Sequence, residues 1–384
     1  TRLLENKDDN TTFFALANTM EVLNFTKTNK SHGWMGIKFQ LNPNTEPNEV
    51  IIHIKLLEND ALMQQSTIGI IGVNLLYACK FHYDSPTTFL KSLTDNVSID
   101  RFRITMMRMS GPDLDYIDNK LLAVQLVKNK MTRSIMFDSN GNVQQPSDML
   151  YKKNVLAFRG SFMPVTYIAK DILNKSMALF GLDEDFEHDN TLSFCELSIN
   201  NILSKGEIDE QDFMDRAELL CSLGHYVMIS KFQEYYKLVE YFNNYTKQRI
   251  GLTMGVNNLV DVFDEKYYRH LSGGILEAFG KLFFKDLQVY LYPMKDGETG
   301  QIMTSNNVKV HPRMKELYKF FKYNGKVMDI IDYDPEIMHI FSRDVLKKIT
   351  NGEEGWEEQL PEGIAEIIKD KNLFTRKLLE SEKS

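Results

Sequence analysis

The sequence predicts an α/β protein with repeated βα units and a mostly parallel sheet, and three observations lead to this prediction. Between Leu192 and Val256, three apolar runs that suit strands alternate with two amphipathic helices. Each apolar run is followed by a short polar loop, and the same alternation extends from about residue 100 to residue 331. Continuous apolar strands separated by helices are typical of a parallel sheet that is covered on both faces.

The expected strands are short apolar runs rich in β-branched and aromatic residues. They are Val50–Leu57, Phe102–Met109, Ser134–Phe137, Val155–Phe158, Leu192–Ile199, Tyr226–Ser230, Ile250–Met254, Leu287–Tyr292 and Val327–Ile331. From residue 100 onward, this alternation fits a (βα)8 barrel, and it equally fits a doubly wound open sheet. We favour the barrel slightly over the open sheet.

Helical patterns fill most of the gaps between these strands, and the pattern over 209–223 is the clearest. Asp209 is its expected N-cap, and Gly224 ends it. Its buried face is expected to contain Phe213, Ala217, Leu220 and Cys221. Other expected helices are a helix that starts at Ser85–Pro86, Asn119–Asn129, Tyr167–Phe180, Lys231–Tyr245, Pro312–Tyr323 and Pro361–Lys371, and Ser66–Cys79 is either an apolar helix or a buried segment.

We expect three segments along the chain. Residues 1–100 form an N-terminal α/β segment, residues 101–350 the main βα-repeat domain, and residues 351–384 a helical tail with an acidic cluster. The chain opens at Thr1 without an initiator methionine, so we expect that further sequence precedes it.

Composition argues against several classes of partner. A net charge of −8 and a pI near 5.6 disfavour nucleic acid, because phosphate binding needs a basic surface. The longest apolar run, Ile68–Cys79, is too short to span a bilayer. The three cysteines form no CxxC pair and the eight histidines form no HxH or HExxH motif, so neither a disulfide framework nor a metal site is expected. We therefore expect a cytoplasmic protein without a membrane partner, and the sequence identifies no cofactor.

The loops that follow the strands are the expected place for chemistry. If the strands are parallel, their carboxyl ends meet at one edge, where ligands bind in α/β sheets. Polar and small residues there suit a small anionic ligand, although loops that turn and cap a helix are polar in any case. The ligand-binding candidates are Arg159, Ser161, Ser230, Gly255 and Asn257. The acid–base candidates at this edge are Glu196 and Lys231.

Two further candidates lie outside these loops. Ser272, Gly273 and Gly274 precede the apolar helix Ile275–Phe284, where backbone N–H groups could face an anion. Glu277, in the first turn of that helix, is either a base or a surface carboxylate, and the two glycines alternatively form a flexible break between helices. His32, beside Gly33 and Trp34, is the histidine whose neighbours best suit a pocket.

Six phrases of the sequence together resemble a family of largely uncharacterised bacterial proteins from cyanobacteria and Bacteroidetes. The phrases are His32–Gln40 (HGWMGIKFQ), Gln145–Phe162, Gly224–Phe242, Ile250–Val256, Gly273–Pro293 and His339–Ile349, and the resemblance covers nearly the whole chain. Members are often labelled nicotinate-nucleotide adenylyltransferase or TonB-dependent receptor. The transferase label implies a histidine pair and an SxxxR-type phosphate clamp, whereas His32–Gly33 is followed by Trp34. The receptor label implies many alternating transmembrane strands, whereas helical patterns dominate this chain.

Three hypotheses for function follow from these observations. The first is a cytoplasmic enzyme that acts on a small anionic metabolite, phosphorylated or nucleotide-like. The second, implied by the resemblance, is nucleotidyl transfer to nicotinate or nicotinamide mononucleotide. The third is a non-catalytic scaffold or assembly subunit, because the sequence holds no catalytic motif and is rich in aromatic residues; a homo-oligomer is compatible with all three.

Overall fold

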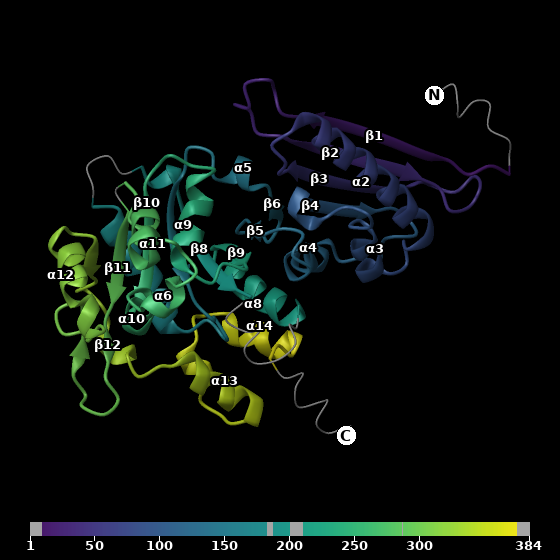
Figure 1. The fold of residues 1–384 in the computed structure, drawn as a ribbon. Coiled ribbons are helices and arrows are strands. Elements are labelled where there is room, and N and C mark those ends of the chain that lie inside the picture. Colours follow the sequence, from purple (N-terminus) through teal and green to yellow (C-terminus); the bar gives the residue numbers. More distant parts are fainter. Residues whose placement is uncertain (1–9, 183–186, 200–209, 286, 375–384) are drawn as a thin grey trace. The chain divides into compact units, whose positions relative to one another are not determined.

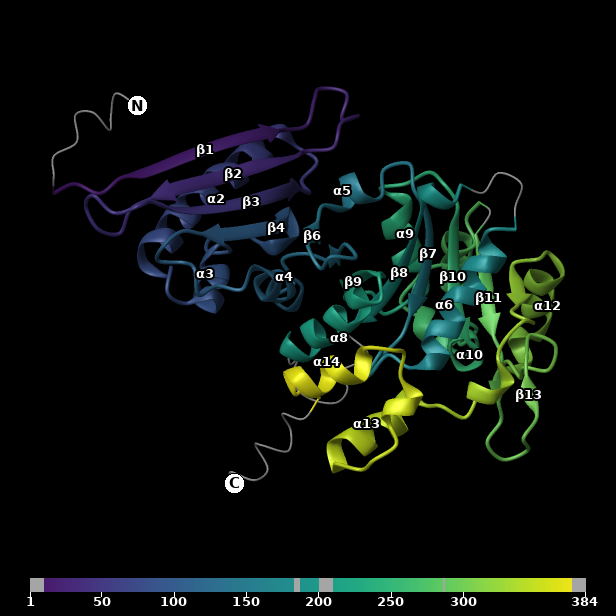
Figure 2. The same cartoon turned by 180° about the vertical axis from the view of Figure 1, so that it is seen from behind.

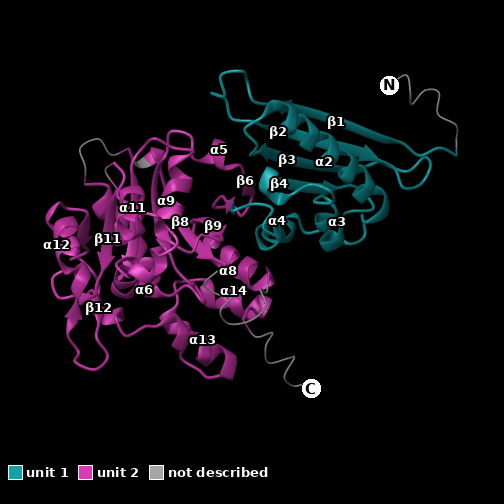
Figure 3. Ribbon diagram, viewed as in Figure 1, with its two compact units in different colours: residues 1–135 teal, residues 136–384 magenta. Residues whose placement is uncertain are grey.

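The computed structural model describes residues 10–182, 187–199, 210–285 and 287–374, and the chain divides into two compact units. Unit 1 is Thr1–Ile135 and unit 2 is Met136–Ser384 (Figure 3). The strand–helix alternation predicted a main domain that starts at residue 101, whereas the structure divides the chain after Ile135. The difference arises because β4 (Phe102–Ser110) and α4 (Asn119–Lys128) complete the sheet and the helical layer of unit 1.

Unit 1 is an antiparallel sheet with helices on one face (Figure 1). Its strand order is β1 (Phe14–Glu21), β2 (His32–Phe39), β3 (Asn48–Leu56), β4. Alternate residues of the strands, such as Met35, Ile37 and Ile52, are buried and share one core with α2 (Ala61–Phe81), α3 (Pro86–Ser92) and α4. The sequence over 14–39 is too polar to indicate strands by itself; β2 is held in the sheet by pairing with β3, and β1 by pairing with β2.

Unit 2 contains an open sheet whose strand order is β14-β11-β10-β7-β8-β9-β5-β6 among the described residues. The strands are β5 (Ser134–Phe137), β6 (Val143–Gln144), β7 (Asn154–Arg159), β8 (Thr191–Ser198), β9 (Tyr226–Ser230), β10 (Ile250–Gly255), β11 (Gln288–Tyr292) and β14 (Val327–Asp329). The ladders from β14 through β9 are parallel, and β6 pairs with β5 antiparallel. The α/β class and the mostly parallel sheet are thereby confirmed.

The preference for a barrel was wrong, because β14 and β6 lie at the two ends of the strand order and do not pair. The physical reason lies in the connection after β9. The chain returns to pair β10 with β7, so the sheet grows outward in both directions from β7. A barrel requires each new strand to be added on the same side until the sheet closes.

Helices cover both faces of this sheet (Figures 1 and 2). The described helices of unit 2 are α5 (Pro146–Met149), α6 (Tyr167–Phe180), α8 (Glu210–Ser222), α9 (Tyr235–Asn243), α10 (Val256–Val262), α11 (Gly274–Leu282), α12 (Lys315–Tyr323), α13 (Ser342–Asn351) and α14 (Ile364–Lys371), and a short ribbon is formed by β12 (Met294–Lys295) and β13 (Ile302–Met303). Asp209, the expected N-cap of α8, lies outside the described residues. Within the described part of the chain, no helix is both long and apolar enough to cross a membrane.

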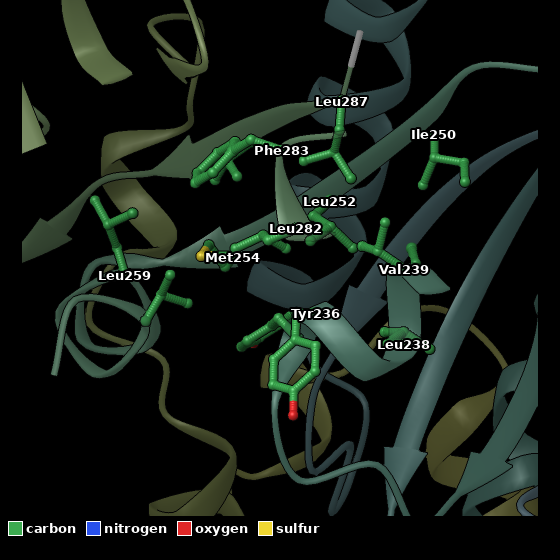
Figure 4. Close-up of a cluster of buried hydrophobic side chains, with 14 of the residues drawn as sticks. Tyr236, Leu238, Val239, Ile250, Leu252, Met254, Leu259, Leu282, Phe283 and Leu287 are labelled. Carbon is green, nitrogen blue, oxygen red and sulfur yellow. The ribbon is translucent and has the colours of Figure 1, made fainter. Parts of the chain in front are cut away.

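The side chains of β10 show how the two faces differ. Leu252 and Met254 point into a core shared with α9, α10 and α11, where Tyr236, Leu259 and Leu282 surround them (Figure 4). Successive strand residues point to opposite faces, so Gly251 and Thr253 face the other side, which is covered by α6. A Cβ atom at Gly251 would lie 2.9 Å from the ring of Tyr290 and 3.0 Å from the ring of Phe180 in α6. We call these two sides the α9 face and the α6 face.

Acid is expected to weaken unit 2 in part through His225, which precedes β9. Burial, and then the charge of Lys170, lowers the pKa of His225 below its usual value of 6.5. The unfolded chain therefore binds a proton more readily than the folded chain, so the stabilising contribution is complete above pH 6.5 and is lost as the pH falls through the folded pKa. The variant His225→Gln should lose less stability than the parent between about pH 7.5 and about pH 5.

The two tryptophans make this measurement specific, because Trp34 lies in unit 1 and the buried Trp356 lies in unit 2. In a Trp34→Phe background, urea unfolding followed by fluorescence reports on unit 2 alone. Parallel stability–pH curves for His225→Gln and its parent would show that His225 does not contribute to the loss of stability in acid.

Candidate functional site

The order of the parallel strands reverses beside β7. Numbered along the chain, β7, β8, β9, β10, β11 and β14 stand in the spatial order 3-2-1-4-5-6. The connections that leave the carboxyl ends of β7 and β10 therefore run in opposite directions. Open α/β sheets bind their ligands in the crevice outside such a reversal, at the carboxyl edge of the strands. This edge, between β7 and β10, is where a site is expected on topology alone.

On the α6 face, a buried threonine stands at this reversal. Thr166 is the N-cap residue of α6, yet its side chain makes no capping bond. It is 0% exposed, and its Oγ1 has no hydrogen-bond partner among the described residues. The amides in the first turn of α6 carry the positive end of the helix dipole, which favours an anion at this position.

A second buried hydroxyl lies on the same face. Thr253 of β10 is 0% exposed, pairs in the ladder with Phe158 of β7, and its Oγ1 likewise lacks a partner in the described part of the chain. A buried polar group without a hydrogen bond costs about 1–3 kcal/mol, so such groups call for an explanation. We call Thr166, Thr253 and the first turn of α6 the switch-point site.

The switch-point site is held by contacts that fix α6. The hydroxyl of Tyr292, at the carboxyl end of β11, donates to Oδ2 of Asp171 in α6 at 2.6 Å. The backbone N–H of Asp334, beyond β14, donates to the same oxygen at 3.2 Å. Burial, and then the hydrogen bond to Asp171, raises the pKa of Tyr292, so this phenol keeps its proton. The start of α6 is thereby tied to the ends of two strands.

On the α9 face, the structure brings three of the predicted residues together. Glu196 of β8 is 0% exposed and is the ladder partner of Arg159 in β7. Arg159 donates through Nε to Oε2 of Glu196 and through Nη2 to Oε1 at 3.2 Å, while Nη1 donates to the carbonyl oxygen of Gln233 at 2.8 Å. The hydroxyl of Ser230 donates to Oε1 of Glu196. Each nitrogen of the guanidinium and each oxygen of the carboxylate therefore has a hydrogen-bond partner.

Tyr235 completes this cluster. The guanidinium of Arg159 lies over its ring at 4.5 Å, which suits a cation–π contact. Burial is the largest single influence on the pKa of Arg159 and acts to lower it, but the interactions with Glu196, Tyr235 and Glu234 together raise it. Burial also raises the pKa of Tyr235 to about 12, and its hydroxyl has no partner among the described residues. An ion pair so enclosed favours a structural role at the carboxyl edge over anion binding by Arg159.

The remaining candidates from the strand ends lie at the same edge. Ser161 is exposed in the loop after β7, Gly255 ends β10, and Asn257 is exposed in the first turn of α10. Lys231 directly follows β9 and is half-buried, and it makes at least one polar, ring or electrostatic contact.

The glycine-rich turn before α11 is occupied by the helix's own carboxylate. The backbone N–H of Gly273 donates to Oε2 of Glu277 at 2.9 Å, and that of Gly274 donates to the carbonyl oxygen of Leu271 at 3.0 Å. The hydrogen bond from Gly273, followed by that from Lys281, lowers the pKa of Glu277. Glu277 thus caps its helix, and the two amides that could have faced an anion already have acceptors. Ser272 is exposed beside them.

His32 belongs to unit 1. Its Nδ1 lies 3.1 Å from Nε2 of His53, and Nδ1 of His53 lies 2.5 Å from Oγ1 of Thr105. The ring of Trp34 packs against His53 at 4.8 Å. Among the described residues, no group of three or more histidine, cysteine or acidic side chains could hold a metal ion.

The parallel ladders and the strand order, which reverses between β7 and β10, define unit 2 as a doubly wound α/β domain of the Rossmann type. Solved structures with some likeness to the chain are nicotinic acid mononucleotide adenylyltransferase of Plasmodium falciparum complexed with NaAD (14% identity, TM-score 0.36) and the same enzyme complexed with APC (13%, 0.33). Each match covers 58% of this chain and 97% of the other. A putative nicotinate-nucleotide adenylyltransferase from Vibrio parahaemolyticus matches over 58% of this chain and 96% of its own (12%, 0.26). At these values the likeness carries no argument about activity. No protein-family model and no curated protein matches the chain.

Proposed function

We propose that unit 2 binds a small phosphorylated, nucleotide-like metabolite at the switch-point site. The observation that carries this proposal is the buried hydroxyl of Thr166, which has no partner in the described part of the chain and lies at the N-terminus of α6, where the strand order reverses. A phosphate group supplies acceptor oxygens for this hydroxyl and for the amides of the first turn, and its charge matches the helix dipole. Thr253 would contact a second polar group of the same ligand.

The protein is proposed to be an enzyme acting on this metabolite. Ser161 and Asn257 are exposed at the carboxyl edge of the sheet. Lys231, which directly follows β9 at that edge, is the acid–base candidate. Arg159 and Glu196 would position the ends of β7 and β8 without touching the ligand, because their polar atoms already bind each other.

Nucleotidyl transfer to nicotinate or nicotinamide mononucleotide is the finer form of this proposal. Transferases of the HxGH class stabilise the transferring phosphate with a histidine pair, and the loop over 160–166 contains no histidine. In this chain, stabilisation of the phosphate charge would fall to the amides of α6 and the hydroxyl of Thr166. With amides and a hydroxyl in place of the histidine pair, the protein would be either a slow transferase or a binding module without turnover.

Thermal unfolding with defined ligands tests the binding proposal. Trp356 fluorescence in the Trp34→Phe background is followed with phosphate, pyrophosphate, AMP, ATP and nicotinate mononucleotide. A ligand at about a hundred times its dissociation constant stabilises the native state by about 2.7 kcal/mol, so AMP, ATP or the mononucleotide should raise the melting temperature. Production of pyrophosphate from ATP and nicotinate mononucleotide separates transfer from binding alone.

A matched pair of isosteric variants links the shift to the switch-point site. Thr166→Val removes a hydroxyl without a partner, so stability should hold while the ligand binds about tenfold more weakly. Thr246→Val, at the amino edge of the sheet, removes a hydroxyl that donates to the carbonyl oxygen of Lys153 at 2.6 Å and accepts from Gln248. It should lower the melting temperature and leave the affinity unchanged. No shift with any probe at millimolar concentration, or equal affinity for Thr166→Val and its parent, would refute the site.

A further inference from the structure

We propose that the protein forms an antiparallel homodimer through the exposed side of α2 in unit 1. This inference is independent of the function proposed for unit 2. It rests on the size and charge of the exposed residues along α2.

Helix α2 carries large apolar residues on its exposed side as well as on its buried side. Its buried residues, such as Ile71 and Leu75, pack in the core of unit 1. On the other side, Leu62 is 75% exposed, Val73 65% and Tyr77 50%. A surface helix of a monomer usually places charged and polar residues there, and exposed apolar stretches of this kind mark interaction sites.

The exposed residues follow the spacing of a helix-pairing seam. Leu62, Ser66, Gly69, Val73, Leu76 and Lys80 are separated by four, three, four, three and four residues, and each is exposed or half-buried. Such a spacing places side chains in one line along a helix and allows a second helix to pack against it. We call these six residues the α2 seam.

Residue size along the α2 seam selects a second copy in antiparallel orientation. The small residues Ser66 and Gly69 lie in its first half, and the larger Val73 and Leu76 lie in its second half. An antiparallel partner places Val73 against Gly69 and Leu76 against Ser66, so that the four contacts nearest the two-fold axis each join a small residue to a larger one. The helices can then approach closely, and the same contacts recur across the two-fold axis. Parallel pairing would place Gly69 against Gly69 and leave a gap.

Charge at the ends of α2 favours the same orientation. Asp60, the exposed N-cap residue, accepts a hydrogen bond from the backbone of Met63, and Lys80 is exposed in the last turn. Antiparallel pairing brings Lys80 of each copy to the N-terminal end of the other helix, near its Asp60, and opposes the two helix dipoles. Parallel pairing would bring the two Lys80 side chains together. The seam is therefore complementary to itself in one orientation only.

Disulfide crosslinking tests this register. In the proposed dimer, position 62 of one copy lies beside position 80 of the other, whereas the two copies of position 62 are about 27 Å apart along the helix. Disulfides need Cα atoms within about 7 Å of each other. A mixture of Leu62→Cys and Lys80→Cys should form a disulfide-linked dimer under mild oxidation, and neither variant alone should do so. The native cysteines are buried and should not contribute.

A charge substitution tests the interface without crosslinking. Val73→Glu buries an unpaired carboxylate in the dimer but not in the monomer, so the dissociation constant should rise about a hundredfold. Thr87→Glu introduces the same charge at an exposed position of α3, which is not part of the α2 seam, and should leave association unchanged. Sedimentation velocity over micromolar protein concentrations measures both. A monomeric parent, crosslinking of Leu62→Cys alone, or a Val73→Glu variant that dimerises as the parent does would overturn the proposal.

Discussion

Replacing Glu196 by leucine is expected to destabilise unit 2 by about 3–5 kcal/mol, because it leaves a buried guanidinium without its counter-charge. Arg159 is 6% exposed, and two of its nitrogens donate to Glu196. Water cannot replace the lost carboxylate without opening the edge of the sheet. Ser230 would also lose its acceptor. Urea unfolding followed through Trp356, in the Trp34→Phe background, measures the change in the free energy of unfolding.

The double variant Arg159→Met, Glu196→Leu is the control for this expectation. Replacing both members of a buried ion pair by apolar residues removes the unpaired charge, so the double variant should be more stable than Glu196→Leu alone. If Glu196→Leu lowers the free energy of unfolding by less than about 1 kcal/mol, water reaches the ion pair and the pair is not enclosed.

The ion pair of Arg159 and Glu196 shows which features of the site could be predicted from the sequence and which could not. The strands around Arg159 and Glu196 could be predicted because each is a continuous apolar run between helical patterns, which is the local signature of a buried parallel strand. The prediction of an edge shared by Arg159, Glu196 and Ser230 followed from that. Their hydrogen bonds could not be predicted, since they depend on the neighbour relations β7–β8–β9, which strand patterns do not contain.

Strand order also explains the failure to distinguish the barrel from the open sheet. The preference for a barrel rested on counting βα units, and the return of β10 to β7 leaves that count unchanged. Thr166 carried a usable signal, because a threonine before an apolar helical run is a typical N-cap. Its importance depends instead on the absence of a partner for its hydroxyl. Thr253 lies inside an apolar strand and gave no signal at all.

Replacing Phe279 by alanine is expected to destabilise unit 2 by about 3–5 kcal/mol, through a cavity at the centre of an aromatic cluster. Phe279 of α11 is 2% exposed, and its ring packs edge-to-face against four others. The ring centroids lie 4.9 Å from Phe263, 5.2 Å from Phe321, 5.5 Å from Phe283 and 6.1 Å from Tyr268. Edge-to-face pairs add about 0.5–1.5 kcal/mol each beyond the area that they bury.

Phe320→Ala provides a matched control for Phe279→Ala, because it removes the same atoms from a nearby helix. Phe320 is 60% exposed and contacts one ring of the cluster, that of Phe321, at 5.4 Å. Its loss should change the free energy of unfolding by no more than about 0.5 kcal/mol. Since α11 is the last helix of the connection from β10 to β11, a large loss for Phe279→Ala measured through Trp356 would show that the α9-face core supports the carboxyl edge as a single cooperative unit. Equal effects of the two variants would mean that α11 unfolds separately from the sheet, and the geometry of that edge would then not depend on the core beneath it.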